Sequence, residues 1–384
     1  MSQTQPNSPD IGNWLKLIRA DEVGPVGFAR LLKQFDSVDR ALGASVSELT
    51  KVDGIGAKTA ERIAATRDKF DADAELDLAA KLGVWIVTIR DERYPHLLRQ
   101  IYDPPPVLYL KGTLHRQDSL AVAIVGSRRC SFYGQEQASR LAHLLASAGF
   151  TICSGMARGI DTAAHNGALS ACGRTLAAQG CGLAHVFPPE NKKLFEAIPA
   201  SGACISELPL QSEPRAEHFP PRNRIIAGLS LATIVIEAPL NSGALITAHA
   251  ALDYGREVMA VPGRVDSHLN AGPHKLIKEG AKLVENVEDV MEALGYIGEQ
   301  LKEHVTQAAH QADEKVARAA RAAADLKLTG DERRIYDCLS KEASHIEQII
   351  TDAGLSPGSV NAALVSLQLK GLVKQLPGSM FVKK

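Results

Sequence analysis

Two arginine-bearing segments occur where the sequence predicts turns after buried strands. The first is Val125-Gly-Ser-Arg-Arg129, followed by Ser131-Phe-Tyr-Gly134 and a predicted helix. A glycine at a strand end lets the backbone approach a ligand closely, helix N-terminal amides suit an anion, and arginine can grip a phosphate. Gly126, Ser127 and Arg128 are therefore candidate anion-binding residues, and the alternative is a tight turn with solvated arginines. The fingerprint G-x-G-x-x-G is absent here, so NAD binding is not expected.

The second segment, Phe219-Pro-Pro-Arg222-Asn223-Arg224, combines an aromatic ring with two guanidinium groups just before an apolar helical stretch. The positive end of that helix adds to the charge of the arginines, and a phenylalanine ring offers a face on which a base can stack. A stacking ring beside a basic anion cradle is typical of single-stranded nucleic acid binding. The alternative is a core phenylalanine beside two surface arginines.

A third turn contains Gly155 at a strand end and places Asp161 and His165 four residues apart. Side chains at this spacing share one helix face, so the two could form a hydrolytic couple. However, no serine or cysteine stands in an elbow motif such as G-x-S-x-G, and two ligands do not make a metal site. The favoured interpretation is a helix-capping aspartate with a structural histidine, while Gly155 lies at the ligand-binding edge.

Further candidates follow a buried strand that ends at Glu237. Ser242 and Gly243 begin the next helix and supply more amide donors, and Lys275 adds a cation later in the chain. Glu237 alone could act as a general base, but it has no obvious carboxylate partner for paired acid–base chemistry.

Composition narrows these possibilities. The chain has 384 residues with 43 Lys+Arg against 44 Asp+Glu, so its formal charge of −1 excludes coating DNA by bulk charge and leaves local basic patches. Its six cysteines form no C-x-x-C pair and no Cys/His cluster with zinc-ligand spacing, so neither a metal nor a cofactor is expected. No apolar stretch reaches the roughly 18 residues that span a bilayer, so we expect a cytoplasmic protein without a membrane partner.

These residues need a scaffold that brings strand ends together. Apolar runs rich in β-formers alternate with helix-length segments such as 135–148 and 243–254, which predicts an α/β fold with a doubly wound parallel sheet. The runs are 84–89, 120–125, 150–153, 175–178, 203–206, 233–237 and 257–261. Ligands of such sheets bind outside the carboxyl ends of the strands, where the glycine- and arginine-bearing turns are expected.

Periodicity divides the rest of the chain into further parts. Residues 11–83 predict an all-helical domain of the SAM or helix-hairpin-helix kind. In its turn, Gly54 and Gly56 either hold a phosphate with exposed amides or only join two helices. Residues 296–327, rich in Ala, Glu, Lys, Arg and Gln, predict a linker. Residues 328–384 predict three helices and a β-hairpin, an arrangement that resembles a winged helix.

Taken in order, the motifs resemble those of the DNA-processing protein A family (DprA, also called Smf). They cover most of residues 85–285, and together they are highly specific. The matching pieces are Val125-Gly-Ser-Arg128, Tyr133-Gly134, Ser154-Gly-Met-Ala-Arg-Gly-Ile-Asp161, Ala164-His165, Phe219-Pro-Pro-Arg-Asn-Arg-Ile-Ile226, Glu237-Ala-Pro, Ser242-Gly243, Thr247-Ala248 and Val261-Pro-Gly263.

The resemblance implies a Rossmann-like DNA-binding domain over residues 84–295 that works as a homodimer. It implies a non-enzymatic protein that binds single-stranded DNA in natural transformation, protects incoming strands and loads the recombinase RecA onto them. Two positions depart from the family pattern, because a basic residue is Ala216 here, beside Arg215, and an asparagine is His274. Arg215 could substitute for the missing basic residue. The implied DNA pocket consists of Ser127, Arg128, Phe219, Arg222, Asn223 and Arg224.

Two other functions stay open. The first is a nucleotide-hydrolysing enzyme, since the family's sheet is similar to that of phosphoribohydrolases. Those enzymes have a P-G-G-x-G-T-x-x-E pattern, in which the glutamate comes after the glycine-rich loop, whereas Glu237 comes before the loop here. The second concerns the winged-helix-like domain, which could read duplex DNA through Ser359, Asn361 and Ser366 or contact another protein. Its third helix has no arginine before Lys370.

Overall fold

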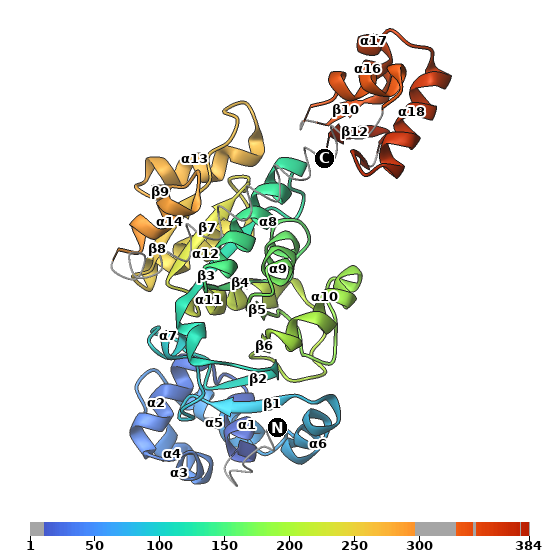
Figure 1. Cartoon of the computed structure of the whole chain (residues 1–384). Helices are drawn as coiled ribbons and strands as arrows, with labels where there is room; N and C mark the ends of the chain where they lie inside the picture. The colour runs from blue at the N-terminus through green and yellow to red at the C-terminus, as the bar shows by residue number, and fades with distance from the viewer. Residues whose placement is uncertain (1–10, 296–327, 341–342, 377, 384) are drawn as a thin grey trace. The chain divides into compact units, whose positions relative to one another are not determined.

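Figure 1 shows the computed structural model, which describes residues 11–295, 328–340, 343–376 and 378–383. The chain divides into two units, the larger covering most of residues 11–295 and the smaller centred on residues 328–383. The predicted linker at 296–327 lies outside the described residues. Among the helices that are described, none is long and apolar enough to cross a membrane.

The N-terminal part of the larger unit is helical, as predicted. Apolar residues recur every three or four positions, so Trp14, Leu17 and Phe28 are fully buried. Ser45 and Glu48 form a capping box that fixes the start of one helix. The helices are α1 (Ile11–Arg19), α2 (Pro25–Phe35), α3 (Val38–Gly43), α4 (Val46–Leu49), α5 (Ala57–Thr66) and α6 (Ala72–Leu82).

The turn before α5 requires a glycine. Gly54 has a φ of +78°, and a Cβ at this position would lie 2.1 Å from Nη1 of Arg30. Arg30 also donates a hydrogen bond to the carbonyl oxygen of Asp53 at 3.2 Å. These contacts favour the interpretation as an interhelical turn, and phosphate binding at this turn stays a prediction.

The larger unit contains one nine-stranded sheet, in the order β1-β2-β6-β5-β4-β3-β7-β8-β9. The strands from β6 to β9 pair in parallel, whereas β2 pairs antiparallel with both β1 and β6. The strand bounds are β1 (Trp85–Thr88), β2 (Val107–Gly112), β3 (Ala121–Gly126), β4 (Thr151–Ser154), β5 (Thr175–Ala178), β6 (Gly202–Ser206), β7 (Ala232–Ile236), β8 (Glu257–Ala260) and β9 (Lys282–Leu283).

The predicted α/β sheet is confirmed, with one correction at its edge. All seven predicted runs form strands, but β1 lies antiparallel to β2 and is not part of the parallel set. Strands β2 and β9 were not predicted. Strand β2 follows three prolines, Pro104 to Pro106, which carry no amide donors and pointed to a loop instead.

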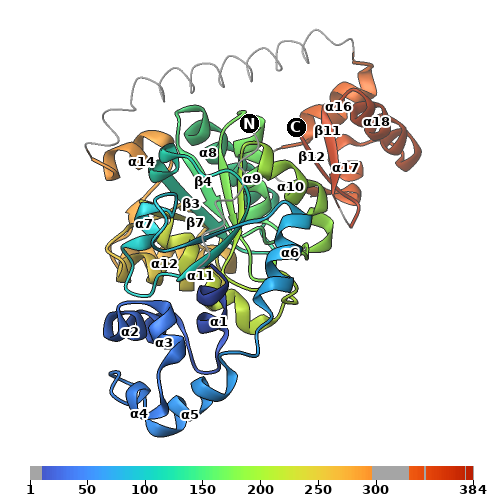
Figure 2. The same ribbon diagram turned by 90° about the horizontal axis from the view of Figure 1, so that it is seen from below.

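Helices cover both faces of the sheet. Figure 2 shows α8 (Phe132–Ser147) and α9 (Ile160–Ser170) on one face, with α11 (Phe219–Gly228) and α12 (Gly243–Asp253) on the other. The remaining elements of this unit are α7 (His96–Arg99), α10 (Lys192–Ala197), α13 (Ala271–Lys278), α14 (Val287–Ala293) and the short 3-10 turns η1 (Arg116–Leu120), η2 (Pro189–Asn191), η3 (Ile198–Ala200), η4 (Ala216–His218) and η5 (His268–Asn270).

Strand β3 lies at the topological switch point of the sheet, where the order of the parallel strands reverses. The chain continues from β3 through α8 to β4 on one side, whereas β7 pairs with the opposite edge of β3. The loops that follow β3 and β7 therefore lead away from each other and leave a crevice at the carboxyl ends of these strands.

The smaller unit confirms the predicted winged helix. Its strands form a three-stranded sheet in the order β10-β12-β11, and its core is built around Ile335, Leu364, Leu367 and Phe381. The elements are α16 (Gly330–Cys338), β10 (Ser344–His345), α17 (Ile346–Ala353), α18 (Pro357–Leu369), β11 (Val373–Leu376) and β12 (Met380–Lys383).

Candidate nucleic-acid interface

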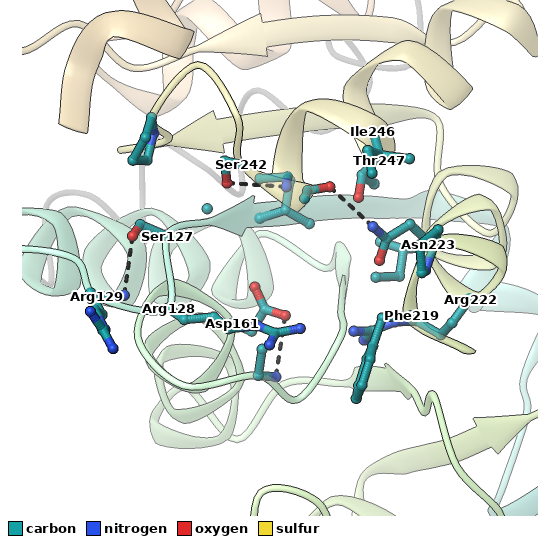
Figure 3. A pocket seen from close by; sticks show the side chains of 18 of the residues that line it. Ser127, Arg128, Arg129, Asp161, Phe219, Arg222, Asn223, Ser242, Ile246 and Thr247 are labelled. Atoms are coloured by element: carbon teal, nitrogen blue, oxygen red, sulfur yellow. Dashed lines mark hydrogen bonds between the residues drawn. The ribbon is translucent and has the colours of Figure 1, made fainter. Parts of the chain in front are cut away.

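A cavity of about 780 Å³ opens at the carboxyl ends of β3 and β7, where the topology predicts a ligand site. Its walls come from the turn after β3, the loop after β4, helix α11 and the start of α12 (Figure 3). The lining residues are Val125, Gly126, Ser127, Arg128, Arg129, Ala157, Asp161, Phe187, Pro214, Ala216, Phe219, Pro220, Arg222, Asn223, Ile226, Pro239, Ser242, Gly243, Ala244, Ile246, Thr247, His268 and Leu269.

The turn after β3 is fixed by its backbone. A Cβ on Gly126 would lie 1.9 Å from the carbonyl oxygen of Ile236, so only glycine fits between β3 and β7. The amide of Ser127 donates to the carbonyl oxygen of Glu237 at 2.6 Å, and its hydroxyl accepts from the amide of Arg129 at 3.1 Å. Gly126 and Ser127 therefore shape the turn, and Arg128 is the first residue after them whose side chain can contact a ligand.

Arg128 and Arg129 are exposed at the cavity and have no ion pair with the described part of the chain. Figure 3 shows the Arg128 side chain pointing toward Asp161 and Phe219, while Arg129 points away from them. The Arg128 guanidinium carbon lies 5.0 Å from the centre of the Phe219 ring. A cation placed in this way has a weakly bound partner that a phosphate can replace.

Phe219 is half-buried among groups from three segments. Its ring centre lies 5.5 Å from that of Phe187 and 5.6 Å from the guanidinium carbon of Arg222. A Cβ on Gly180 would meet the ring at 2.8 Å, so the ring packs directly against the backbone there. The ring is thus held in place from below while it still lines the cavity.

Asp161 is buried and serves the loop after β4. One of its carboxylate oxygens accepts hydrogen bonds from the amides of Gly155 at 3.1 Å and Ala157 at 3.3 Å. Burial raises the pKa of this carboxyl, while the Arg222 guanidinium, the two amides and Arg128 act in the opposite direction. The carboxylate is therefore committed to the shape of the loop.

Arg222 forms part of the cavity floor, with only 4% of its surface exposed. Its Nη1 donates to the carbonyl oxygens of Gly155 and, at 2.9 Å, of Ala178. A Cβ on Gly155 would lie 1.8 Å from the same nitrogen, so this glycine makes room for the guanidinium. Burial lowers the pKa of Arg222, and Asp161 opposes that shift.

The first turn of α12 forms the opposite wall. Ser242 caps this helix, because its hydroxyl accepts from the amide of Ala244 at 3.3 Å. Asn223 donates its side-chain amide to the carbonyl oxygen of Gly243 at 3.0 Å and so ties α11 to this turn. Gly243 is exposed, and the positive end of α12 faces the cavity that the arginines border.

Comparison with models of protein families shows which family has the domain that contains this cavity. The family model described as "DNA recombination-mediator protein A" matches residues 85–295, which contain the whole sheet and the cavity. The chain belongs to the DprA family. Models for the DprA winged helix domain and the DprA-like N-terminal HHH domain match residues 317–379 and 10–66.

Individual DprA and Smf proteins agree with this assignment. Protein Smf from Synechocystis is 34% identical over 97% of this chain and 98% of its own length. DNA processing protein DprA from Streptococcus pneumoniae is 44% identical over 53% of this chain and 72% of the relative. An X-ray structure of the pneumococcal protein has a TM-score of 0.65 at 35% identity and covers 73% of this chain and 97% of that one.

A second solved structure is that of DNA processing protein A from Helicobacter pylori, described as giving insights into the single-stranded DNA binding mode of that protein. It has a TM-score of 0.50 at 29% identity and covers 55% of this chain and 95% of that chain.

Several residues predicted to bind DNA are buried or lie outside the cavity lining, and their contact with DNA stays a prediction. Arg222 and Gly155 form a buried support, as described above. Arg224 lies outside the cavity lining and pairs with Glu207 at 2.5 Å and Asp103 at 3.4 Å. Arg222 and Arg224 lie two positions apart on α11, about 200° around the helix axis, so only one of them can face the cavity floor.

Two further predicted cations are also absent from the cavity lining. Arg215 lies 3.8 Å from Glu217 and is exposed, while its neighbour Ala216 lines the cavity in its place. Lys275 lies on α13 and pairs with Glu279 at 3.7 Å. His274 approaches the carbonyl oxygen of Gly263 at 3.1 Å, so it holds a loop. The contribution of Arg215 and Lys275 to DNA binding stays a prediction.

Besides Asp161, four polar or aromatic residues that line the cavity were not among the predicted site residues. Arg129 is next to the predicted Arg128, and Thr247 follows the predicted Gly243 by four residues, a spacing that places both on one helix face and could have indicated it. Phe187 and His268 come from loops far away in the sequence, and nothing in their local pattern indicates that they reach this edge.

His165 has the predicted structural role, whereas the predicted helix cap at Asp161 is wrong. The N-cap of α9 is Gly159, and the Asp161 carboxylate accepts from loop amides instead. His165 is fully buried and lies 2.7 Å from the hydroxyl of Thr175, so it does not pair with Asp161. Among the residues that the structure describes, no cluster of His, Cys, Asp or Glu could hold a metal ion. Burial raises the pKa of the Cys153 thiol to about 12, which keeps this core thiol protonated.

His165 is expected to make the fold sensitive to acid. Burial, together with the charge of Arg222, lowers the pKa of His165 from 6.5 to about 3. Between these two pH values the imidazole is protonated in the unfolded chain but neutral in the folded chain. The free energy of unfolding should therefore fall by about 1–1.5 kcal/mol between pH 7 and pH 5.5. Urea titrations should show this slope reduced in His165→Gln and retained in His249→Gln, which changes an exposed histidine on α12. An equal slope in wild type and His165→Gln would contradict the assignment.

Proposed function

We propose that this chain binds single-stranded DNA in the cavity at the ends of β3 and β7, without sequence readout and without turnover. The observation that carries the proposal is Arg128, an exposed guanidinium with no described acidic partner that lies 5.0 Å from the Phe219 ring. A cation for the backbone beside a ring for a base is the pair of groups that single-stranded nucleic acid requires. Membership of the DprA family and the single-stranded DNA named for the Helicobacter pylori protein support it.

We further propose that the bound strand is incoming DNA in natural transformation, and that the chain protects it and loads RecA onto it. Working as a homodimer is part of this proposal. It is supported by large apolar side chains exposed on segments that border the cavity, namely Leu240 at 63%, Ile246 at 46% and Val265 at 92%. RecA nucleation on strands precoated with single-stranded-DNA-binding protein should accelerate when this chain is added.

Hydrolysis of nucleotides receives no support from the geometry. Of the described residues that line the cavity, Asp161 is the only carboxylate, and its oxygen already accepts two backbone amides. Glu237 is buried and does not line the cavity. No free base should be released from nucleoside monophosphates, and steady release abolished by Glu237→Gln would establish the enzyme instead.

Arg128→Ala is expected to weaken single-stranded DNA binding and to flatten its salt dependence. The slope of log K against log salt is negative, and for single strands each lost phosphate contact reduces its magnitude by about 0.7. Fluorescence anisotropy at several salt concentrations measures both quantities, on single-stranded and duplex DNA of equal length. An unchanged slope in a folded Arg128→Ala protein would remove Arg128 from the interface.

Arg224→Ala is the matched control for that experiment. Arg224 sits in the same arginine-bearing region, but it is bonded to Asp103 and Glu207 outside the cavity. The structure therefore predicts lower stability for Arg224→Ala with an unchanged salt slope. A slope that falls as much as in Arg128→Ala would show that Arg224 contacts the backbone.

A further inference from the structure

Helix α18 of the winged-helix unit, labelled in Figure 1, exposes an apolar stripe. Val365 is 55% exposed and Leu369 is 86% exposed, and Gly358 and Ala362 are exposed on the same side. The four residues follow one another at spacings of four, three and four, which places them along one seam of the helix. The opposite side of α18, with Val360, Leu364 and Leu367, fills the core of the domain.

This stripe is unsuited to nucleic acid. None of the residues from Pro357 to Leu369 is charged, so the helix offers no cation to a phosphate. The first basic residue after it, Lys370, pairs with Glu332 at 2.7 Å. Burying the seam therefore requires an apolar partner.

We propose that α18 docks antiparallel on α18 of a second copy of this chain. Small residues stand at one end of the seam and large ones at the other, so a two-fold axis brings small against large. The pairs Gly358 with Leu369 and Ala362 with Val365 have the same midpoint, between residues 363 and 364. One axis through that midpoint therefore satisfies both pairs at once, as an isologous contact demands.

The chemistry of the seam fits such a pair. Leu369 of each copy enters the space that Gly358 leaves on the other, and the small residues let the two helices approach closely. An uncharged face meets its own copy without like-charge repulsion. One 13-residue helix buries less area than the roughly 1,200–2,000 Å² of a stable interface, so the contact is weak and its occupancy depends on the concentration of the chain.

Sedimentation of the full chain without DNA tests the contact. Leu369→Glu places a charge on a side chain that is 86% exposed, so the fold is kept, and self-association should weaken by about 10- to 100-fold. Gln375→Glu adds the same charge to exposed strand β11, outside the four residues of the seam, and its carboxylate can still accept from the side-chain amide of Gln368, so it should leave the masses as in wild type. Equal masses for wild type and Leu369→Glu would overturn the proposal. So would a loss of duplex DNA binding in Leu369→Glu with the masses unchanged.

A size reversal tests the register itself. No atom lies within 4 Å of a Cβ built on Gly358, so Gly358→Leu is tolerated by the domain. It should nevertheless weaken association, because two leucines would then compete for one space. Adding Leu369→Ala to this variant reverses the order of sizes and should restore association. If Gly358→Leu associates more tightly than wild type, the stripe associates through non-specific apolar contact and the proposed residue pairs are wrong.

Discussion

Arg222→Met is expected to lower the free energy of unfolding by about 3–5 kcal/mol, the typical cost of removing one partner from a buried charged network. The guanidinium satisfies the carbonyl oxygens of Gly155 and Ala178 and faces the buried Asp161 carboxylate. Methionine fills much of the same space but donates no hydrogen bond, so these acceptors would stay buried without a partner. Urea unfolding followed by tryptophan fluorescence measures the loss. Both tryptophans of the chain, Trp14 and Trp85, lie in the larger unit and report on it alone.

Arg128→Met is the matched control, because it removes the same group from an exposed position. Its stability should stay within about 0.5 kcal/mol of wild type, as is usual for surface substitutions. Gly155→Ala should resemble Arg222→Met, since the added Cβ would occupy the position of Nη1. An Arg222→Met protein that unfolds like wild type and binds DNA with a flatter salt slope would return Arg222 to the interface.

The contrast between Arg222 and Arg128 shows what sequence could predict about the site. The turns were predicted correctly, because alternating strands and helices fix the edge of the sheet at which they meet. Which arginine faces the cavity depended on burial. Arg222 and Arg224 point to nearly opposite sides of α11, and only tertiary packing decides that the first bonds to carbonyl oxygens and the second pairs with Asp103 and Glu207.

The fold was predictable to a similar depth. Continuous apolar runs identified the buried parallel strands, since both of their faces are covered by helices. Strand β2 carries the run Val-Leu-Tyr-Leu, but its antiparallel pairing with β6 joins segments nearly a hundred residues apart. Local pattern contains no signal for such a pairing. The same holds for Phe187, which reaches the Phe219 ring from a distant loop.

Phe219→Leu is expected to weaken single-stranded DNA binding by about 1–3 kcal/mol, or about 5- to 150-fold. Leucine retains apolar contact with Gly180 and Phe187 but offers no flat face on which a base can stack. Stacking releases no counterions, so the salt slope should stay that of wild type. Anisotropy titrations at several salt concentrations, with thermal melts of the same samples, separate the loss of a base contact from a loss of structure.

The position of Arg128 over the ring makes a double-mutant cycle informative. In the free protein the guanidinium lies 5.0 Å from the ring centre, and a base that stacks there must displace it. We expect Arg128 to move from the ring to a phosphate, so that one strand engages both groups. The two substitutions should then be non-additive, because each removes a contact that the other helps to form. Phe219→Leu protein that melts early but binds as tightly as wild type at low temperature would show that the ring belongs to the core. The cavity would then hold DNA through Arg128 and the helix-end amides of α12 alone.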